Sequence, residues 1–234
     1  NVKAGGNGVN NGLAQLYRYD TCLGTYEYVQ TTSVDSNYYA FYDLRPGKYY
    51  VRAKPDSTSS YHGNYVTTYY PGNTNWKNAD SVILSGISQT KYADISLVKS
   101  GNSNGSGNIT GNVSGNKSKC GNKRRPSSKP LSNEAVYLLD MNGNPVRVTY
   151  TDQQGNYSFD DLALKAYKVH VEITGYQAYD EQVTLSAQDK DAEVDYTVDN
   201  KQIKKERPTG IADEANTIGF KVYPAPANAR VNVQ

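Results

Sequence analysis

The chain contains an internal repeat, and this repeat constrains the possible folds more than any other feature of the sequence. Six positions of the first half recur with the same spacings 118 residues later. The first set comprises Tyr39, Phe41, Leu44, Tyr49, Val51 and Ala53, and the second comprises Tyr157, Phe159, Leu162, Tyr167, Val169 and Val171. Segment 16–20 also aligns with 136–140 at a shift of 120, whereas 82–85 and 94–97 align with 183–186 and 195–198 at a shift of 101. The smaller downstream shift places about 17 extra residues in the first copy, within or near 61–77.

Both copies have the residue pattern of β-strands. Tyr39 and Phe41 alternate with polar neighbours, as do positions 49, 51 and 53, and this is the period of a half-buried strand. Pro46-Gly47 lies between these segments and is typical of a turn. The chain has 22 Tyr but only one Met and one Trp, and no segment has a convincing ten-residue helical period. Short strands separated by turns over about 100 residues predict a sandwich, so we expect an all-β chain of two β-sandwiches in tandem.

Composition suggests where the two domains begin and end. The expected segments are a first sandwich at 1–99 with an aromatic insertion at 61–77, a linker at 100–107, a second sandwich at 108–200 with a basic loop at 115–130, and a charged connector at 201–217. The linker contains only Ser, Gly and Asn, which is typical of flexible coil. We therefore expect the two domains to move independently.

One stretch of the second copy resembles a known family. Residues 151–159 read T-D-Q-Q-G-N-Y-S-F and are followed by Leu162 and by Tyr167-Lys168-Val169, which resembles the carboxypeptidase-regulatory-like family. Residues 109–113 resemble its opening strand, and Gly175-Tyr176 its "G-Y" after the central hairpin. The resemblance implies prealbumin-like (Ig-like) β-sandwiches related to bacterial surface B-type repeats. It also implies that Asn1-Val2 is the cut end of the matching strand in copy one, which lacks the family's Gly but keeps the Pro-Gly turn.

The C-terminal residues resemble a second family. Segment 220–227 reads F-K-V-Y-P-A-P-A, and together with 231–233 it resembles the start of the C-terminal sorting domain of bacterial type IX secretion. Ala225 stands where that family usually has Asn. The resemblance implies that 218–234 is the start of a truncated sorting domain. It further implies type IX secretion machinery as a partner, and a protein that is secreted or lies on the outer face of the outer membrane.

The sequence gives little support to catalysis. Residues 101–105 match G-x-S-x-G, but a nucleophile elbow needs a strand before it and a helix after it, and this match lies in the linker. His62 and His170 are the two histidines, and neither has a nucleophile and an orienting carboxylate in a triad-like pattern. His170 alternates with Val169 and Val171, which predicts that it faces solvent. We expect no enzyme activity, no catalytic residue and no cofactor.

Metal binding has similarly weak support. The aspartates nearest to predicted turns are Asp140, Asp152, Asp160 and Asp161. Related surface repeats bind calcium through Asp-rich loops, but this chain has no D-x-D-x-D-G run, so Asx turns are favoured over a calcium site. Two Cys and two His exclude a zinc site rich in these residues. Cys22 and Cys120 fall one in each copy, so they are either incidental thiols or an interdomain bridge.

The aromatic insertion is the best candidate for a binding site. Rigid aromatic rings beside Asn and Gly are typical of glycan- and protein-binding surfaces. The candidate ligand-binding residues are Tyr65, Tyr69, Tyr70 and Trp76, with a surface polysaccharide or a protein as the ligand. The alternative, which we favour, is that these rings cover a sheet edge or one end of the sandwich.

The basic loop at 115–130 offers a weaker candidate. Its six cations could attract polyanions, but a solvated loop is the default interpretation. The loop has no aromatic residue for stacking on bases, and the net charge of the chain is only +2, so nucleic acid is not an expected partner. No run of 18 apolar residues predicts a membrane-spanning segment.

These features favour a non-catalytic structural or interaction module of a secreted or cell-surface bacterial protein, which serves in spacing or adhesion. One alternative is a carbohydrate- or protein-binding module that uses the aromatic insertion. Another is that the two domains are accessory domains of an exported hydrolase.

Overall fold

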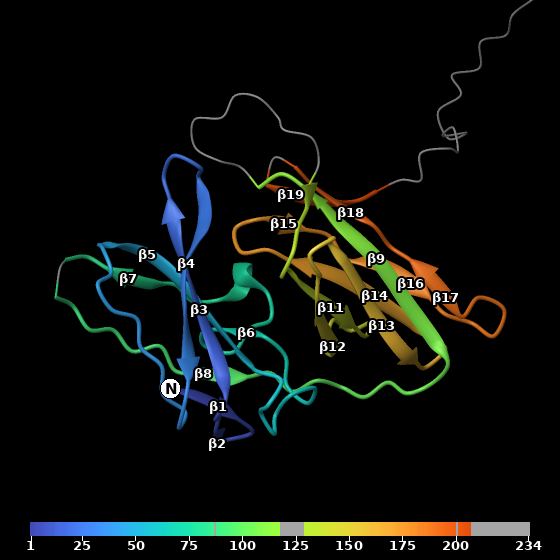
Figure 1. Ribbon diagram of the computed structural model, residues 1–234, viewed down its shortest axis with the longest axis horizontal. Helices are drawn as coiled ribbons and strands as arrows, with labels where there is room; N and C mark the ends of the chain where they lie inside the picture. The colour runs from blue at the N-terminus through green and yellow to red at the C-terminus, as the bar shows by residue number, and fades with distance from the viewer. Residues whose placement is uncertain (87, 118–128, 200, 207–234) are drawn as a thin grey trace, which may run out of the picture.

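The computed structural model describes residues 1–86, 88–117, 129–199 and 201–206 (Figure 1). They form two β-sandwiches that lie side by side, each made of two sheets, and no sheet contains strands from both sandwiches. The all-β fold predicted from the sequence is thus confirmed. No helix in these ranges is long and apolar enough to cross a membrane.

The first sandwich is built around β3 and β5. Its strands are β1 (Val2–Ala4), β2 (Asn7–Gly8), β3 (Gly12–Asp20), β4 (Thr25–Val34), β5 (Gly47–Pro55), β6 (Thr68–Tyr69), β7 (Val82–Leu84) and β8 (Ile95–Leu97), with one 3-10 turn, η1 (Trp76–Asn78). One sheet has the order β4-β3-β5-β6, with β7 also paired to β5, and the other has the order β2-β1-β8. Leu16, Val51 and Ile95 are among the buried residues between the sheets.

The second sandwich has the same plan. Its strands are β9 (Gly107–Gly115), β10 (Lys129–Pro130), β11 (Ala135–Leu139), β12 (Pro145–Tyr150), β13 (Asn156–Leu162), β14 (Ala166–Glu172), β15 (Gln177–Ala178), β16 (Glu181–Thr184), β17 (Asp191–Glu193), β18 (Tyr196–Asp199) and β19 (Gln202–Lys205). One sheet has the order β12-β11-β14-β16, and β9 joins the strands of the other. Ile109, Leu138, Val169 and Val198 are fully buried between them.

The two sandwiches are copies of one unit at the level of single hydrogen bonds. The Tyr49 hydroxyl donates to the Arg45 carbonyl at 2.5 Å, and 118 residues later the Tyr167 hydroxyl donates to the Ala163 carbonyl at 2.9 Å. In each copy the first strand runs parallel to a late strand, β1 beside β8 and β9 beside β18. Tyr49 and Tyr167 therefore make equivalent hydrogen bonds at equivalent positions of the two copies.

The strand predicted around Tyr39 and Phe41 is wrong for the first copy. These residues lie outside any strand, whereas Tyr157 and Phe159 lie in β13. In the second copy β13 pairs with β9, whereas in the first copy the equivalent β1 has only three residues and pairs with β2 and β8. The two aromatic rings nevertheless pack edge to face at 5.7 Å, as Tyr157 and Phe159 do at 6.0 Å.

The linker at 100–107 is hydrogen-bonded to the second sandwich, and its expected flexibility stays a prediction. The Gly101 amide donates to the Pro145 carbonyl at 2.8 Å, and the buried Ser103 hydroxyl donates to or accepts from Tyr167. In Figure 1 this green segment runs from β8 to the start of β9. The connector expected at 201–217 also begins with a strand, since β19 pairs with β18. The expected sorting domain at 218–234 lies outside the described residues.

Candidate functional site

The aromatic insertion lies between the two sandwiches. Its backbone forms β6 and η1, and β6 pairs with β5 through Arg52–Tyr69 and Ala53–Thr68. Tyr69 has none of its surface exposed, and its hydroxyl lies 2.6 Å from the Thr174 hydroxyl of the second sandwich. Ligand binding through Tyr69 is therefore contradicted by the structure. Tyr70 is half-buried against the core of the first sandwich.

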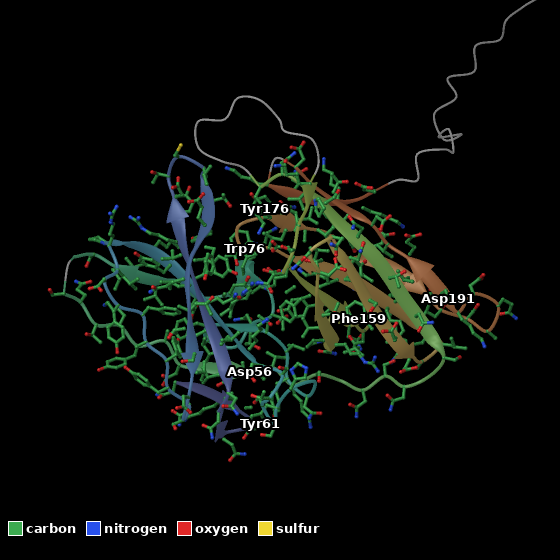
Figure 2. All side chains as sticks on the ribbon, viewed as in Figure 1. Asp56, Tyr61, Trp76, Phe159, Tyr176 and Asp191 are labelled. Carbon is green, nitrogen blue, oxygen red and sulfur yellow. The ribbon has the colours of Figure 1, made fainter. Side chains whose placement is uncertain are left out.

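Trp76 also contacts residues of both sandwiches. Its indole Nε1 donates to the Tyr176 carbonyl at 2.7 Å, and its ring centroid lies 5.9 Å from Tyr26 and 6.0 Å from Tyr50 (Figure 2). The polar edge of the ring is thus used between the domains, and a role of Trp76 in ligand binding stays a prediction. Tyr65 alone of the four predicted residues lines an open groove.

The "G-Y" pair of the second copy is part of the same interface. The Gly175 carbonyl accepts from the Thr25 hydroxyl at 2.9 Å, directly beside the Tyr176 carbonyl that accepts from Trp76. Gly175 has a φ of 89°, and a Cβ added there would lie 2.2 Å from Thr25 Oγ1 and 2.7 Å from the Tyr26 nitrogen. Glycine is required at this position both by backbone conformation and by close approach of the other domain.

His170 lies on the face of β14 that is turned to the first sandwich, so its predicted exposure to solvent is wrong. The side chain is 6% exposed, with Nδ1 at 2.7 Å from Asp180 and Nε2 at 2.9 Å from Glu172. Glu172 is 1% exposed, and its other oxygen accepts from the Trp76 amide at 3.1 Å. Burial alone would lower the pKa of His170, but hydrogen bonds to Asp180 and Glu172 outweigh it and raise the pKa to about 9. An imidazolium held by two carboxylates of its own domain is a buried ion pair and not a general base.

Apolar and cationic groups complete the interface. Val66 of the insertion packs with Tyr137 and Leu139 of β11 in one buried cluster, and the Tyr137 hydroxyl donates to the Thr67 carbonyl at 2.7 Å. Arg52 is 3% exposed, and its Nε donates to Gln15 at 2.8 Å. An interface with this much buried apolar and polar contact opposes the independent motion that the linker composition predicts.

An open groove of about 580 Å³ lies where the insertion, the linker and β12 meet. Its polar lining includes Lys54, Tyr65, Asn102, Arg147 and Tyr150, so both sandwiches contribute to it. The exposed His62 lies at the same groove, with no nucleophile–carboxylate arrangement around it among the lining residues. Burial, followed by the charge of Arg52, lowers the pKa of Lys54 to about 8. A volume of this order is within the range of small-ligand sites.

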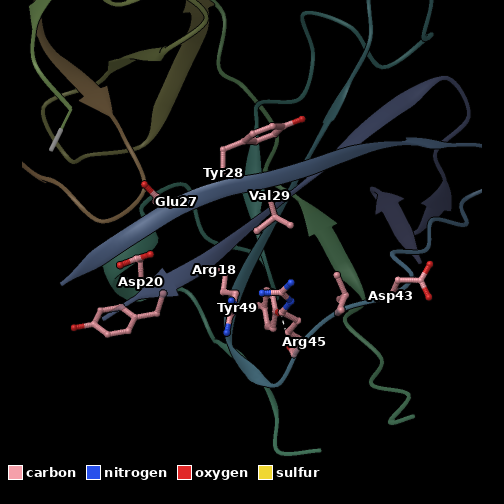
Figure 3. Close-up of a pocket in the computed structure, with 10 residues that line it drawn as sticks. Arg18, Asp20, Glu27, Tyr28, Val29, Asp43, Arg45 and Tyr49 are labelled. Carbon is pink, nitrogen blue, oxygen red and sulfur yellow. Dashed lines mark hydrogen bonds between the residues drawn. The ribbon is translucent and has the colours of Figure 1, made fainter. Parts of the chain in front are cut away.

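A second, shallower hollow of about 310 Å³ lies on the first sandwich (Figure 3). Arg18, Asp20, Glu27, Asp43 and Arg45 bring both signs of charge to it, but no Ser, Cys, Lys or His is among the described residues that line it. The Asp20 carboxylate accepts from two backbone amides of its own turn.

Two of the four aspartates that could hold calcium, Asp140 and Asp152, cap their own turns. Asp140 accepts from the Asn142 and Asn144 amides at 2.9 and 2.8 Å, and Asp152 accepts from Gln154 and Asn156 at 2.8 Å each. These are the Asx turns that the sequence favours. In the described residues no group of three or more His, Cys, Asp or Glu side chains is arranged to hold a metal ion.

The basic loop is described only at its two ends. Lys117 forms an ion pair with Glu134, and Lys129 lies in β10, while 118–128 lie outside the described residues. Cys22 is disulfide-bonded rather than a free thiol, and Cys120 also lies outside the described residues.

Comparison with known families supports the prealbumin-like domains. Residues 124–199 match the carboxypeptidase regulatory-like domain. The chain is 30% identical over 175 residues to serine-aspartate repeat-containing protein D of Staphylococcus aureus strain NCTC 8325, a match that covers 73% of this chain and 12% of that protein. It is 29% identical over 142 residues to the protein of the same name from strain Newman, covering 60% of this chain and 10% of that protein. The chain therefore spans only about a tenth of the length of these relatives.

Two solved structures are similar over most of the chain. GBS52, the minor pilin of Streptococcus agalactiae, is 17% identical with a TM-score of 0.30, and the match covers 88% of this chain and 87% of that one. BcpA, the major pilin subunit of Bacillus cereus, is 9% identical with a TM-score of 0.30, and the match covers 85% and 60%. At these scores the similarities add nothing to the description of the fold given above.

The sequence-based search missed the residues that build the interface and the groove. His170 and Glu172 are two apart in a strand and share a face, so their pairing could have been recognised from the period of two. Lys54, Arg147 and Tyr150 come from strands of different sandwiches, and only the packing of the two domains brings them to one groove.

Proposed function

We propose that the chain is a non-catalytic structural segment of a bacterial cell-surface protein, in which two β-sandwiches act as one stiff spacer. The proposal of a stiff spacer rests on the hydrogen bonds that cross the domain interface. Trp76 bonds to Glu172 and Tyr176, and Tyr69 bonds to Thr174. A domain rotation would break these buried bonds together, at about 1 kcal/mol or more each.

Exposure at the cell surface is supported by similarity rather than by geometry. The regulatory-like match at 124–199, the resemblance to bacterial surface repeats and the similarity to serine-aspartate repeat-containing protein D support an exported protein. These relatives do not support the type IX route or the outer face of an outer membrane, so neither is part of the proposal. Labelling of intact producing cells with an antibody against this chain tests surface exposure, and signal only after lysis would contradict it.

The spacer role has a direct physical test. Amide ¹⁵N relaxation of the whole chain should give one rotational correlation time for β3–β5 and β11–β14. In a Trp76→Ala variant the two values should separate, because the interface loses the indole hydrogen bond to the Tyr176 carbonyl and a packed ring. Tyr28→Ala is the control, since Tyr28 is 57% exposed. Two clearly different correlation times in the unmodified chain would refute the stiff spacer.

A further inference from the structure

The interdomain groove has the charge and the shape of a ligand site. All of its described lining residues are neutral or basic: it contains Lys54 and Arg147 but neither Asp nor Glu. Its volume is about 580 Å³, and it is bounded by both sandwiches and by the linker. A groove with uncompensated positive charge favours an anionic ligand.

Lys54 is the cation that is free to bind. Its Nζ lies 3.5 Å from the centroid of the Tyr150 ring, and within the described part of the chain it forms no ion pair. Arg147 is engaged by backbone carbonyls, including that of Ser103, so it contributes charge but is fixed in place. Burial depresses the pKa of Lys54 to about 8, which means that the amine lacks the anion that would stabilise its charge.

The other lining groups are suited to a sugar. Tyr65 and Tyr150 line the groove and are half-buried: the Tyr65 ring packs edge to face on Tyr61, and the Lys54 ammonium covers one face of the Tyr150 ring. What remains exposed of the two rings is available for contact with a pyranose. Asn102 and Asn104 are exposed and supply amide donors and acceptors, and Thr149 adds a hydroxyl. Aromatic rings beside amides and hydroxyls match the alternating apolar and hydroxyl faces of a saccharide.

An acidic peptide fits less well. A bound peptide strand would need a free sheet edge, and β12 is the edge strand at this groove. The linker already runs along the start of β12, because the Gly101 amide donates to the Pro145 carbonyl and Arg147 donates to the Ser103 carbonyl. A continuous edge of β12 is thus not available for pairing.

We infer that this interdomain groove binds a carboxylate-bearing saccharide of the hexuronate class, with Lys54 pairing to the carboxylate and Tyr65 and Tyr150 contacting the sugar ring. Lys54 is not among the groups that form the polar bonds of Tyr69 and Trp76 across the interface, whereas Tyr150 also bonds to Thr67 of the first sandwich, so the test of the site rests on Lys54. It also differs from a site on the aromatic insertion alone, because both sandwiches contribute.

The test is isothermal titration calorimetry of the whole chain with trigalacturonate and with its fully methyl-esterified form. The free acid should bind at least tenfold more tightly than the ester, because the ester has the same rings without the charge. Near pH 8.5 binding should also take up protons, since the carboxylate recharges the partly neutral Lys54 amine. Varying the ionisation enthalpy of the buffer measures this uptake.

Substitutions separate the site from general charge. Lys54→Met keeps the aliphatic stem and should weaken trigalacturonate binding at least tenfold and remove the proton uptake. Lys48→Met on the same strand is the control and should leave both unchanged, since Lys48 does not line the groove. A melting curve checks that each variant is folded.

Three results would overturn the inference. One is equal affinity for the acid and the ester, or no binding of either. Another is unchanged affinity in a folded Lys54→Met variant. The third is tighter binding of triglutamate than of trigalacturonate, which would assign the groove to an acidic peptide.

Discussion

Replacing His170 with Gln should remove a pH-dependent contribution to the free energy of unfolding. The imidazole is 6% exposed and lies within 3 Å of both Asp180 and Glu172, so its charged form is stabilised only in the folded chain. Its pKa rises from 6.5 in the unfolded chain to about 9 in the folded chain. At about 1.4 kcal/mol per pH unit, this difference corresponds to about 3 kcal/mol.

The sign follows from the raised pKa. The contribution of His170 is fully present below pH 6.5, falls as the pH rises, and is lost above about pH 9. Lys54 acts in the opposite direction, because its lowered pKa makes the folded chain release a proton between about pH 8 and 10.5. The difference between the original chain and the variant cancels the Lys54 contribution, since both chains retain Lys54.

Urea unfolding at half-unit steps from pH 5.5 to 9.5 is the assay. The stability difference between the original chain and His170→Gln should be constant below pH 6.5 and should shrink by about 3 kcal/mol between pH 6.5 and 9. His62→Gln is the matched control, because His62 is exposed, and its curve should follow that of the original chain. Parallel curves for the original chain and His170→Gln would refute the assignment of a buried, doubly paired imidazolium.

The remaining predictions concern Gly175 at the domain interface and the repeat-equivalent Tyr49 and Tyr167. Gly175→Ala should cost about 1–3 kcal/mol more than Gly143→Ala in urea unfolding, because both glycines have φ near 88° but only Gly175 has another domain within contact distance. Equal losses of unfolding free energy in the two variants would show that backbone strain alone causes them, and would contradict a steric clash with the first domain at Gly175. Tyr49→Phe should cost about 1 kcal/mol, since it removes one hydroxyl-to-carbonyl bond, and Tyr167→Phe should cost more, because its hydroxyl makes the equivalent bond and also bonds to the buried Ser103. A loss in only one variant would contradict the structural equivalence of the two copies.

The fold was predictable because it depends on local patterns that occur twice. The spacing of Tyr49 and Tyr167 predicts equivalent strands, and the structure has them in β5 and β14. The absence of a strand at Tyr39 was not predictable in the same way, since alternation takes no account of pairing partners: β9 pairs with β13, whereas β1 pairs with β2 and β8. The available partner, and not the period of two, decides whether this segment is a strand.

The candidate site was much less predictable, because it depends on how the sandwiches pack. The aromatic insertion was recognised as unusual, and its structural interpretation accounts for Tyr69 and Trp76. The linker has the composition of flexible coil, yet Ser103 is buried because Tyr167 and Arg147 bond to it. Composition reports what a segment does in isolation, whereas these bonds come from residues over 40 positions away.

The location of the insertion gives the pair of domains a direction. Residues 61–77 of the first copy supply Tyr69 and Trp76 to the interface, whereas the second copy lacks the corresponding 17 or so residues at that point of the repeat. The contact is therefore heterologous: the first copy contributes Tyr69 and Trp76, and the second contributes Glu172, Thr174 and Tyr176, which accept or share their hydrogen bonds. A domain of the second type lacks the insertion, so it could not form this same contact with another domain of its own type.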